Sequence, residues 1–288
     1  MQGAVINVLT RQGSERFLHD ASYWGQTAGL TSQPVRRPVP GAGGLQSGYE
    51  RDRYRDLTTN IGGPAIRDRL WFFTGYQYLR DYDSQPGASP AFPRTYEQDK
   101  IFAKLTWKLA PGWQLLQSIH DESWVNPELP TFVKPFEATM RSHASVPAIT
   151  FGDLTHSSAN TLWDVRAGRF VYDREDDPST GNRTTAGRFD QLTNLSSGAP
   201  QTFGGSNIIR TTAKATVSRF RPGLWAADHQ WKLGVQFDRG DHHVPSVIPT
   251  GVRFVDNGGQ PFQSGPLTRA ASPSRPPGSW PIPSRGVG

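Results

Sequence analysis

The stretch NIGGPAIRDRLWFFTGYQYLRD, residues Asn60–Asp81, decides the fold class of this chain. Gly62-Gly63-Pro64 predicts a tight turn, which Arg67-Asp68-Arg69 keeps polar. Leu70–Arg80 is rich in aromatic residues, and one of its two alternating faces is almost wholly apolar. We expect a half-buried strand of about 11 residues, long for a soluble sheet and suited to a tilted membrane-spanning strand. Taken alone, the stretch fits a long strand of a soluble β-sandwich equally well.

The composition favours many strands joined by polar loops. The chain has 288 residues, of which 35% are hydrophobic and 11% aromatic, with 30 glycines and 24 prolines. No segment approaches the roughly 20 consecutive apolar residues that a membrane helix needs. Cysteine is absent, so the fold uses neither disulfides nor thiolate metal sites.

The charge distribution argues against a nucleic-acid partner. The net charge is +6, but the 31 basic residues are dispersed among 25 acidic ones. The longest basic run is Arg36-Arg37, whereas nucleic-acid binding surfaces cluster their basic residues. We interpret the charge as solvated loop surface.

Two segments alternate cleanly between apolar and polar residues. In residues 96–109 the cationic side chains share one face with Thr106, and in residues 228–238 Lys232 and Gln236 lie opposite apolar neighbours. We therefore predict a lipid-facing set on one side: Leu105, Trp107, Trp231, Leu233 and Val235. We predict a lumen-facing set on the other: Lys100, Lys104, Lys108, Lys214 and Lys232. The second set could meet a plug or an anionic ligand, although simple wetting of the barrel interior is the favoured interpretation.

The expected connections alternate between short and long along the chain. Short ones lie near Gly62, Pro111, Ser158 and Pro222, whereas long ones follow Leu30, Asp81, Trp124 and Tyr172. A transmembrane β-barrel sorts its loops in this way, with short periplasmic turns and long outer loops. We expect an all-β chain: an antiparallel segment of a transmembrane β-barrel with about ten strands.

Three motifs resemble TonB-dependent outer-membrane receptors. Residues 3–14, GAVINVLTRQGS, are similar to the end of the family's plug domain, and residues 57–81 resemble an early pair of barrel strands. Residues 229–243, HQWKLGVQFDRGDHH, are similar to a later strand of the large subfamily that carries an N-terminal carboxypeptidase-regulatory-like domain. The resemblance implies three parts: the plug end at 1–14, the N-terminal part of the barrel at 15–262, and a disordered or misread tail at 263–288.

The resemblance also implies a location and partners. The family takes up a scarce ligand across the outer membrane, driven by the TonB complex, and its barrel contacts lipid outside and its plug inside. This sequence shows no TonB box, no signal peptide, only the last strand of a plug, and about ten strands where the family uses about 22. We therefore expect a fragment whose sheet stays open and curved, with the transported ligand unidentified.

No motif indicates an enzyme, and we expect no catalytic residue, cofactor or metal. Asp238, Asp241, His242 and His243 combine metal-ligand side chains, but their position at the end of a strand favours a solvated cluster. The acidic run Glu175-Asp176-Asp177 favours a turn over a calcium site. The alternative function is a soluble or secreted β-rich module that binds carbohydrate through exposed aromatic residues.

Overall fold

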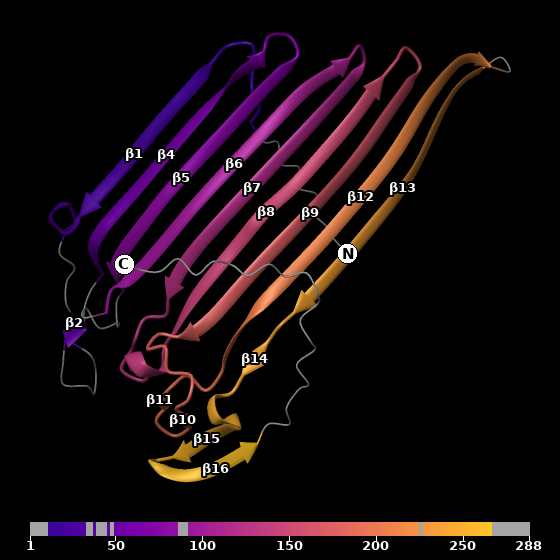
Figure 1. Ribbon diagram of the computed structural model, residues 1–288. Helices are drawn as coiled ribbons and strands as arrows, with labels where there is room; N and C mark the ends of the chain where they lie inside the picture. Colours follow the sequence, from indigo (N-terminus) through magenta and orange to yellow (C-terminus); the bar gives the residue numbers. More distant parts are fainter. Residues whose placement is uncertain are drawn as a thin grey trace.

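The computed structural model describes residues 11–32, 37–38, 45–46, 49–85, 92–224 and 227–266, and these residues form an all-β structure. Three sheets contain its strands, and the largest has ten. Nine of these ten lie side by side in the order β1-β4-β5-β6-β7-β8-β9-β12-β13, and β14 pairs with β12 (Figure 1). Their bounds are β1 (Leu18–Thr27), β4 (Glu50–Ile66), β5 (Leu70–Ser84), β6 (Arg94–Ala110), β7 (Trp113–Pro127), β8 (Met140–Ser157), β9 (Thr161–Pro178), β12 (Phe203–Leu224), β13 (Ala227–His243) and β14 (Ser246–Val247).

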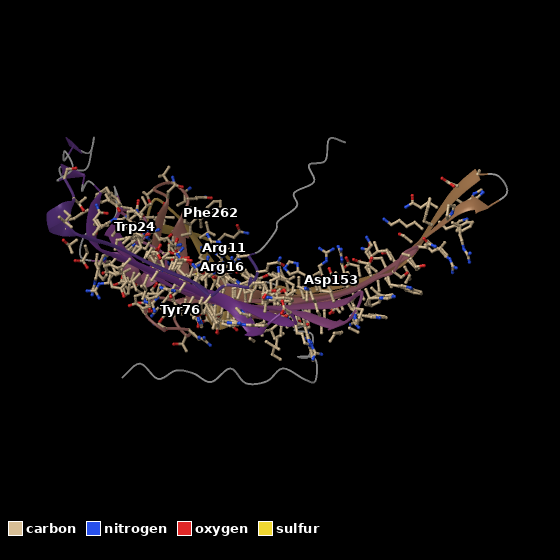
Figure 2. All side chains as sticks on the ribbon, turned by 90° about the horizontal axis from the view of Figure 1, so that it is seen from above. Arg11, Arg16, Trp24, Tyr76, Asp153 and Phe262 are labelled. Carbon is tan, nitrogen blue, oxygen red and sulfur yellow. The ribbon has the colours of Figure 1, made fainter. Side chains whose placement is uncertain are left out.

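The large sheet is antiparallel, curved and open. Every neighbouring pair in it is antiparallel, and β1 and β13 are its two end strands. Seen from above, the sheet bends so that one face is concave and the other convex, with Tyr76 on the convex side (Figure 2). The predicted open, curved antiparallel sheet is therefore confirmed.

The connections are short at one end of the sheet and long at the other. Residues 67–69, 111–112 and 158–160 link successive strands at the short end. Residues 128–139 and 179–202 are two of the long links, and both contain further local structure. The 3-10 turn η2 (Phe136–Ala138) lies in the first of these links. Two further 3-10 turns are η1 (Ala28–Leu30) and η3 (Pro249–Gly251). No helix in the described part of the chain is long and apolar enough to cross a membrane.

The turn predicted at Gly62-Gly63-Pro64 is wrong, because these residues lie inside β4. The chain reverses at 67–69, where Asp68 has a φ of 60° and Arg69 N–H donates to the Ile66 carbonyl at 3.1 Å. Aspartate tolerates this left-handed conformation. Gly63 instead makes room for an aromatic ring, since a Cβ there would lie 2.5 Å from Phe17 Cδ1. Pro64 borders a register irregularity, which tolerates its missing N–H group.

The long connections fold into a second sheet. It has four strands in the order β11-β10-β15-β16 and lies at the long-loop end of the large sheet (Figure 1). Its strands are β10 (Gly187–Asp190), β11 (Leu195–Gly198), β15 (Val252–Asn257) and β16 (Gln260–Pro266), while β2 (Arg37–Pro38) and β3 (Leu45–Gln46) form a separate pair. The long connection expected after Tyr172 begins only after Pro178, where β9 ends, and β10 and β11 lie within it.

Both ends of the predicted domain scheme lie largely outside the described residues. The strand expected at 3–10 is not among them, and residues 11–14 precede β1 without regular structure. Arg11 lies on the concave side of the sheet (Figure 2), so the chain enters β1 from that side. Of the tail expected at 263–288, residues 263–266 complete β16, and the remainder lies outside the described residues.

The described residues bury little apolar surface within a single layer. The buried hydrophobic residues are Trp71, Ala138, Ala144, Val146 and Ala199, whereas large apolar side chains are exposed along most strands. Soluble monomers rarely expose apolar patches wider than a few hundred Å². The sheet therefore needs an apolar environment or a covering partner on at least one face.

Candidate functional site

An apolar row crosses the convex face of the large sheet. Strand register aligns one apolar residue from each of eight consecutive strands, so that each lies directly opposite the next. The row is Ile66, Leu70, Trp107, Leu115, Leu154, Val165, Ala215 and Val235. It shares the face of Tyr76, because residues two apart along a strand point to the same side. No soluble core covers this row within the described residues.

The five residues predicted to face lipid lie on the convex face. Leu105 and Trp107 in β6 are 46% and 41% exposed, and Leu233 and Val235 in β13 are about 70% exposed. Trp231 stacks beside His229, with the two ring centroids 5.7 Å apart. The geometry brings these side chains onto one surface, and their contact with lipid stays a prediction.

The five lysines predicted to face a lumen lie on the opposite, concave face. Lys104 pairs in register with Ser118, and Lys214 pairs with Gln236 across β12 and β13. Lys104 is buried at 7% exposure, and Lys108 Nζ lies 4.7 Å from the centroid of the Trp71 ring. Lys100 Nζ lies 3.6 Å from Glu122 Oε1. The structure therefore places the five lysines on one face. Among them, Lys100 and Lys108 contact neighbouring side chains.

An ion network occupies the concave face near the long loops. Arg94 donates from Nε to Asp83 Oδ1 at 2.9 Å and from Nη2 to Asp81 Oδ2 at 3.0 Å. Arg51 Nη1 lies 3.5 Å from the other oxygen of Asp81. Asp83 is 1% exposed, so its carboxylate depends on Arg94 and on Gln85, which donates to Oδ2 at 2.6 Å, to replace water.

A second polar group on this face surrounds Glu122 in β7. Gln98 donates to Glu122 Oε1 at 2.6 Å, and His120 Nε2 lies 3.2 Å from Oε2. With Lys100 nearby, the carboxylate has partners from β6 and from its own strand. These groups largely satisfy one another, so the Glu122 carboxylate is held by polar partners on the concave face.

At the long-loop end, Asp190 closes the small sheet. Its carboxylate accepts hydrogen bonds from the backbone N–H groups of Gly259 (2.5 Å), Thr193 (3.0 Å), Gly258 (3.2 Å) and Leu192 (3.0 Å). These bonds stabilise the charged form, Gly259 contributing most, and lower the pKa of Asp190 to about 2. This small sheet, β11-β10-β15-β16, is called the loop sheet below, and an ionised carboxylate stabilises it.

The residues weighed as metal ligands have other partners in the structure. Asp238 accepts a two-point contact from Arg210, and His242 Nε2 lies 3.1 Å from Ser206 Oγ. In the acidic run, Glu175 and Asp177 both bind Arg183. No group of three or more His, Asp or Glu side chains within the described residues could hold a metal ion.

Sequence reasoning missed the Arg94 network and the Asp190 contacts. The Arg94 network had a usable signal. Asp81 and Asp83 are two residues apart, so they share one face of β5, and Arg94 lies opposite Asp83 where the chain returns after the loop. Asp190 had no signal for its two distant donors, Gly258 and Gly259, which lie 68 and 69 residues further along the chain. Its role depends on parallel pairing between β10 and β15, which no local pattern encodes.

Comparison with known proteins gives one partial similarity. Over 75 residues the chain is 35% identical to the TonB-dependent transporter Oar of Myxococcus xanthus. That match covers 26% of this chain and 7% of the transporter, so the shared region spans a small part of the relative. The chain matches no protein-family model, and no solved structure matches it. The partial match agrees with the resemblance found in the sequence at the level of TonB-dependent transport proteins.

Proposed function

We propose that this chain forms part of the barrel wall of an outer-membrane TonB-dependent transporter. The observation that carries the proposal is the apolar row on the convex face, continuous across eight strands, with lysines and ion networks on the concave face. Outer-membrane barrels have this arrangement, with an apolar outside and a polar inside. The partial match to Oar supports the transporter class.

Solvation energetics favour a bilayer over water for the convex face. Each fully buried Leu, Val or Trp side chain gains roughly 1.5–3 kcal/mol relative to exposure in water. A bilayer supplies that burial for the whole row at once. It also requires the backbone polar groups to be paired, which the long antiparallel ladders satisfy over most of their length, apart from register irregularities and the outer edges of β1 and β13. The wall is completed when those edges pair with further strands.

The proposal assigns an orientation and partners. The short turns at 67–69, 111–112 and 158–160 face the periplasm, and the loop sheet faces the exterior. The concave face lines the lumen, where it meets a plug domain and the transported ligand. Energy for uptake comes from the TonB complex. Oar is named a TonB-dependent transporter, which supports this assignment.

Fractionation tests the membrane assignment. Cells producing the complete transporter that contains these residues are lysed, and its distribution is followed between the soluble fraction and membranes washed with alkaline carbonate. We expect the protein in the washed outer membrane, released by detergent alone. Recovery in the soluble fraction without detergent would contradict the proposal and favour the alternative of a β-rich binding module.

Cysteine labelling tests the orientation, because the native chain contains no cysteine. Thr180→Cys places a thiol in the long connection after β9, and Ala159→Cys places a matched thiol in the short turn after β8. Both side chains are exposed. A membrane-impermeant maleimide on intact cells should label Thr180→Cys and leave Ala159→Cys unlabelled until the outer membrane is opened. The reverse pattern would invert the assigned orientation, and equal labelling of intact cells would count against a membrane wall.

A further inference from the structure

On the long-loop side of the apolar row, the convex face carries a cluster of arginine and tyrosine side chains. We name it the arginine–tyrosine cluster, and it consists of Tyr23, Arg53, Arg55, Tyr78, Arg80 and Tyr82. Register aligns its members in neighbouring rows: Arg53 lies opposite Tyr82, and Arg55 lies opposite Arg80. Tyr78 pairs with Leu57, which pairs in turn with Tyr23. The cluster thus borders the apolar face on three adjacent strands, β1, β4 and β5.

Most of the cluster is held in place by contacts within it and with β6. The Arg80 guanidinium carbon lies 4.0 Å from the Tyr78 ring centroid, and Arg80 Nη2 donates to Asp99 at 2.7 Å. The Arg53 guanidinium lies 4.8 Å from the Tyr82 ring centroid. Tyr82 O–H donates to Glu97 at 2.6 Å, and Tyr76 O–H donates to Asp99 at 2.7 Å. Both nearby carboxylates are therefore engaged by other partners.

Like Arg53, whose contact is with the Tyr82 ring, Arg55 has no anionic partner among the described residues. It is exposed and lies directly opposite Arg80, a placement in which like charges destabilise a sheet. On its other side, β1 offers Gly25, which contributes no side chain. The Tyr23 ring leans over that glycine, since a Cβ there would lie 3.0 Å from Tyr23 Cε1. The cluster therefore presents an open position beside Arg55 with positive charge on two sides.

We propose that the arginine–tyrosine cluster binds the anionic phosphate of a membrane lipid, with Arg53 and Arg55 as its principal donors. Arginine matches phosphate because its planar guanidinium donates two parallel hydrogen bonds. Arg53 and Arg55 are two residues apart on one strand, so both reach the same face. Basic residues at a membrane surface attract anionic lipids, and tyrosines gather at the membrane–water interface. This inference rests on the proposed function, which puts the convex face in a bilayer.

The neighbouring surface favours a lipid over a free phosphate ion. Leu57 and Ile61 follow Arg55 along β4 on the same face and are 38% and 45% exposed. Ile101 continues this apolar surface on β6 at 49% exposure. A lipid whose head group sits at Arg55 can lay its acyl chains along these side chains, whereas an inorganic ion gains nothing from them.

Lipid retention measured by native mass spectrometry tests the inference. The complete transporter that contains this chain is extracted in a neutral detergent and equilibrated with mixed phosphatidylglycerol and phosphatidylcholine, which present an anionic and a zwitterionic phosphate respectively. We expect the native chain to retain phosphatidylglycerol in preference. Arg55→Ala should reduce that preference roughly fivefold, and Arg53→Ala together with Arg55→Ala roughly 30-fold, since each basic residue contributes about a fivefold attraction.

Three controls make the outcomes decisive. Lys214→Ala removes an exposed cation from the concave face and should leave the preference unchanged. Arg55→Lys should keep most of it, because the charge remains. If lipid is retained without a preference, or if Lys214→Ala lowers the preference as much as Arg55→Ala, the inference is overturned while the membrane assignment stands. Retention of no lipid at all overturns both, and displacement of the lipid by excess inorganic phosphate reassigns the cluster to free phosphate.

Discussion

Lys104 and Leu105 are neighbours in β6, yet the lysine is buried at 7% exposure and the leucine is 46% exposed. In a water-soluble protein the opposite order is usual, because burying a cation costs free energy and burying a leucine gains it. The inversion is systematic on this strand, since Thr106 is 6% exposed and Trp107 41% exposed. The concave, polar side is thus the more enclosed side of the sheet. This arrangement fits an apolar medium on the convex side, as the proposed function requires.

The first prediction tests that medium with a matched pair in β13. Leu233→Arg places a charge on the convex face, and in a bilayer it should lower the free energy of unfolding by about 2–4 kcal/mol if the residue lies near the midplane. Lys232→Ala, one residue away on the concave face, should change it little. Denaturant unfolding of the protein in lipid vesicles measures both, and equal sensitivity at the two positions would contradict the facing assignment.

The second prediction concerns the contact between Gly63 and the Phe17 ring. A Cβ at Gly63 would lie within 2.9 Å of three atoms of that ring, so Gly63→Ala forces Phe17 to move. We expect a loss of about 1–3 kcal/mol in the free energy of unfolding, the usual cost of overpacking. Gly240→Ala is the matched control, because nothing lies within 4 Å of a Cβ there. In the Phe17→Ala background Gly63→Ala should cost much less, and additive losses in the double variant would refute the contact.

The third prediction is a pH dependence of the loop sheet. Hydrogen bonds from Gly259, Thr193, Gly258 and Leu192 hold the pKa of Asp190 at about 2, below its unfolded value near 3.9. A lowered carboxyl pKa contributes stability that is complete above the unfolded pKa and is lost as pH falls through the folded pKa. Amide exchange protection at Gly258 and Gly259 should therefore hold at pH 5 and decline between about pH 4 and pH 2.

Asp190→Asn is the control for that transition. The amide side chain cannot carry the charge that the four N–H groups stabilise, so protection of Gly259 should be low throughout and show no acid transition. The ion pair between Arg188 and Asp256 supports the same sheet at 2.8 Å, and Arg188→Ala should lower protection without removing the Asp190 transition. An unchanged transition in Asp190→Asn would mean that another group titrates.

The fourth prediction addresses the concave ion network. Arg94→Ala leaves the buried Asp83 carboxylate without its principal donor, and an unsatisfied buried acceptor costs roughly 1–3 kcal/mol in the free energy of unfolding. Arg210→Ala is the comparison, since its pair with Asp238 is 61% exposed on the arginine side and such pairs contribute roughly 0–1 kcal/mol. Chemical unfolding of the two variants gives the difference, and an equal loss would contradict the burial argument.

Sequence patterns predicted the large sheet well where its strands alternate with a period of two, as in residues 96–109 and 228–238. Alternation placed Lys104 and Leu105 on opposite faces, and loop lengths separated the two ends of the sheet. The turn at Gly62-Gly63-Pro64 was mispredicted because glycine and proline serve close approach and a register irregularity there, which depend on the Phe17 ring and on pairing with β5. The small sheet was missed because its two hairpins, β10–β11 and β15–β16, join only through pairing distant in sequence, such as Phe189 with Val255.

The last prediction concerns the two free edges of the large sheet. β1 and β13 end the strand order, and within the described residues neither pairs with the other. A barrel closed from nine adjacent strands would be narrower than one of about 22 strands, because diameter grows with strand number. Its interior would have to hold the long side chains of the concave face, such as Lys100 and Lys214. Left open in hydrocarbon, each unpaired backbone group on β1 and β13 costs several kcal/mol. Residues 1–288 produced alone should therefore aggregate in detergent or remain sensitive to protease. A monodisperse, protease-resistant species that shifts on heating in gel electrophoresis would show that the two edges do pair with each other.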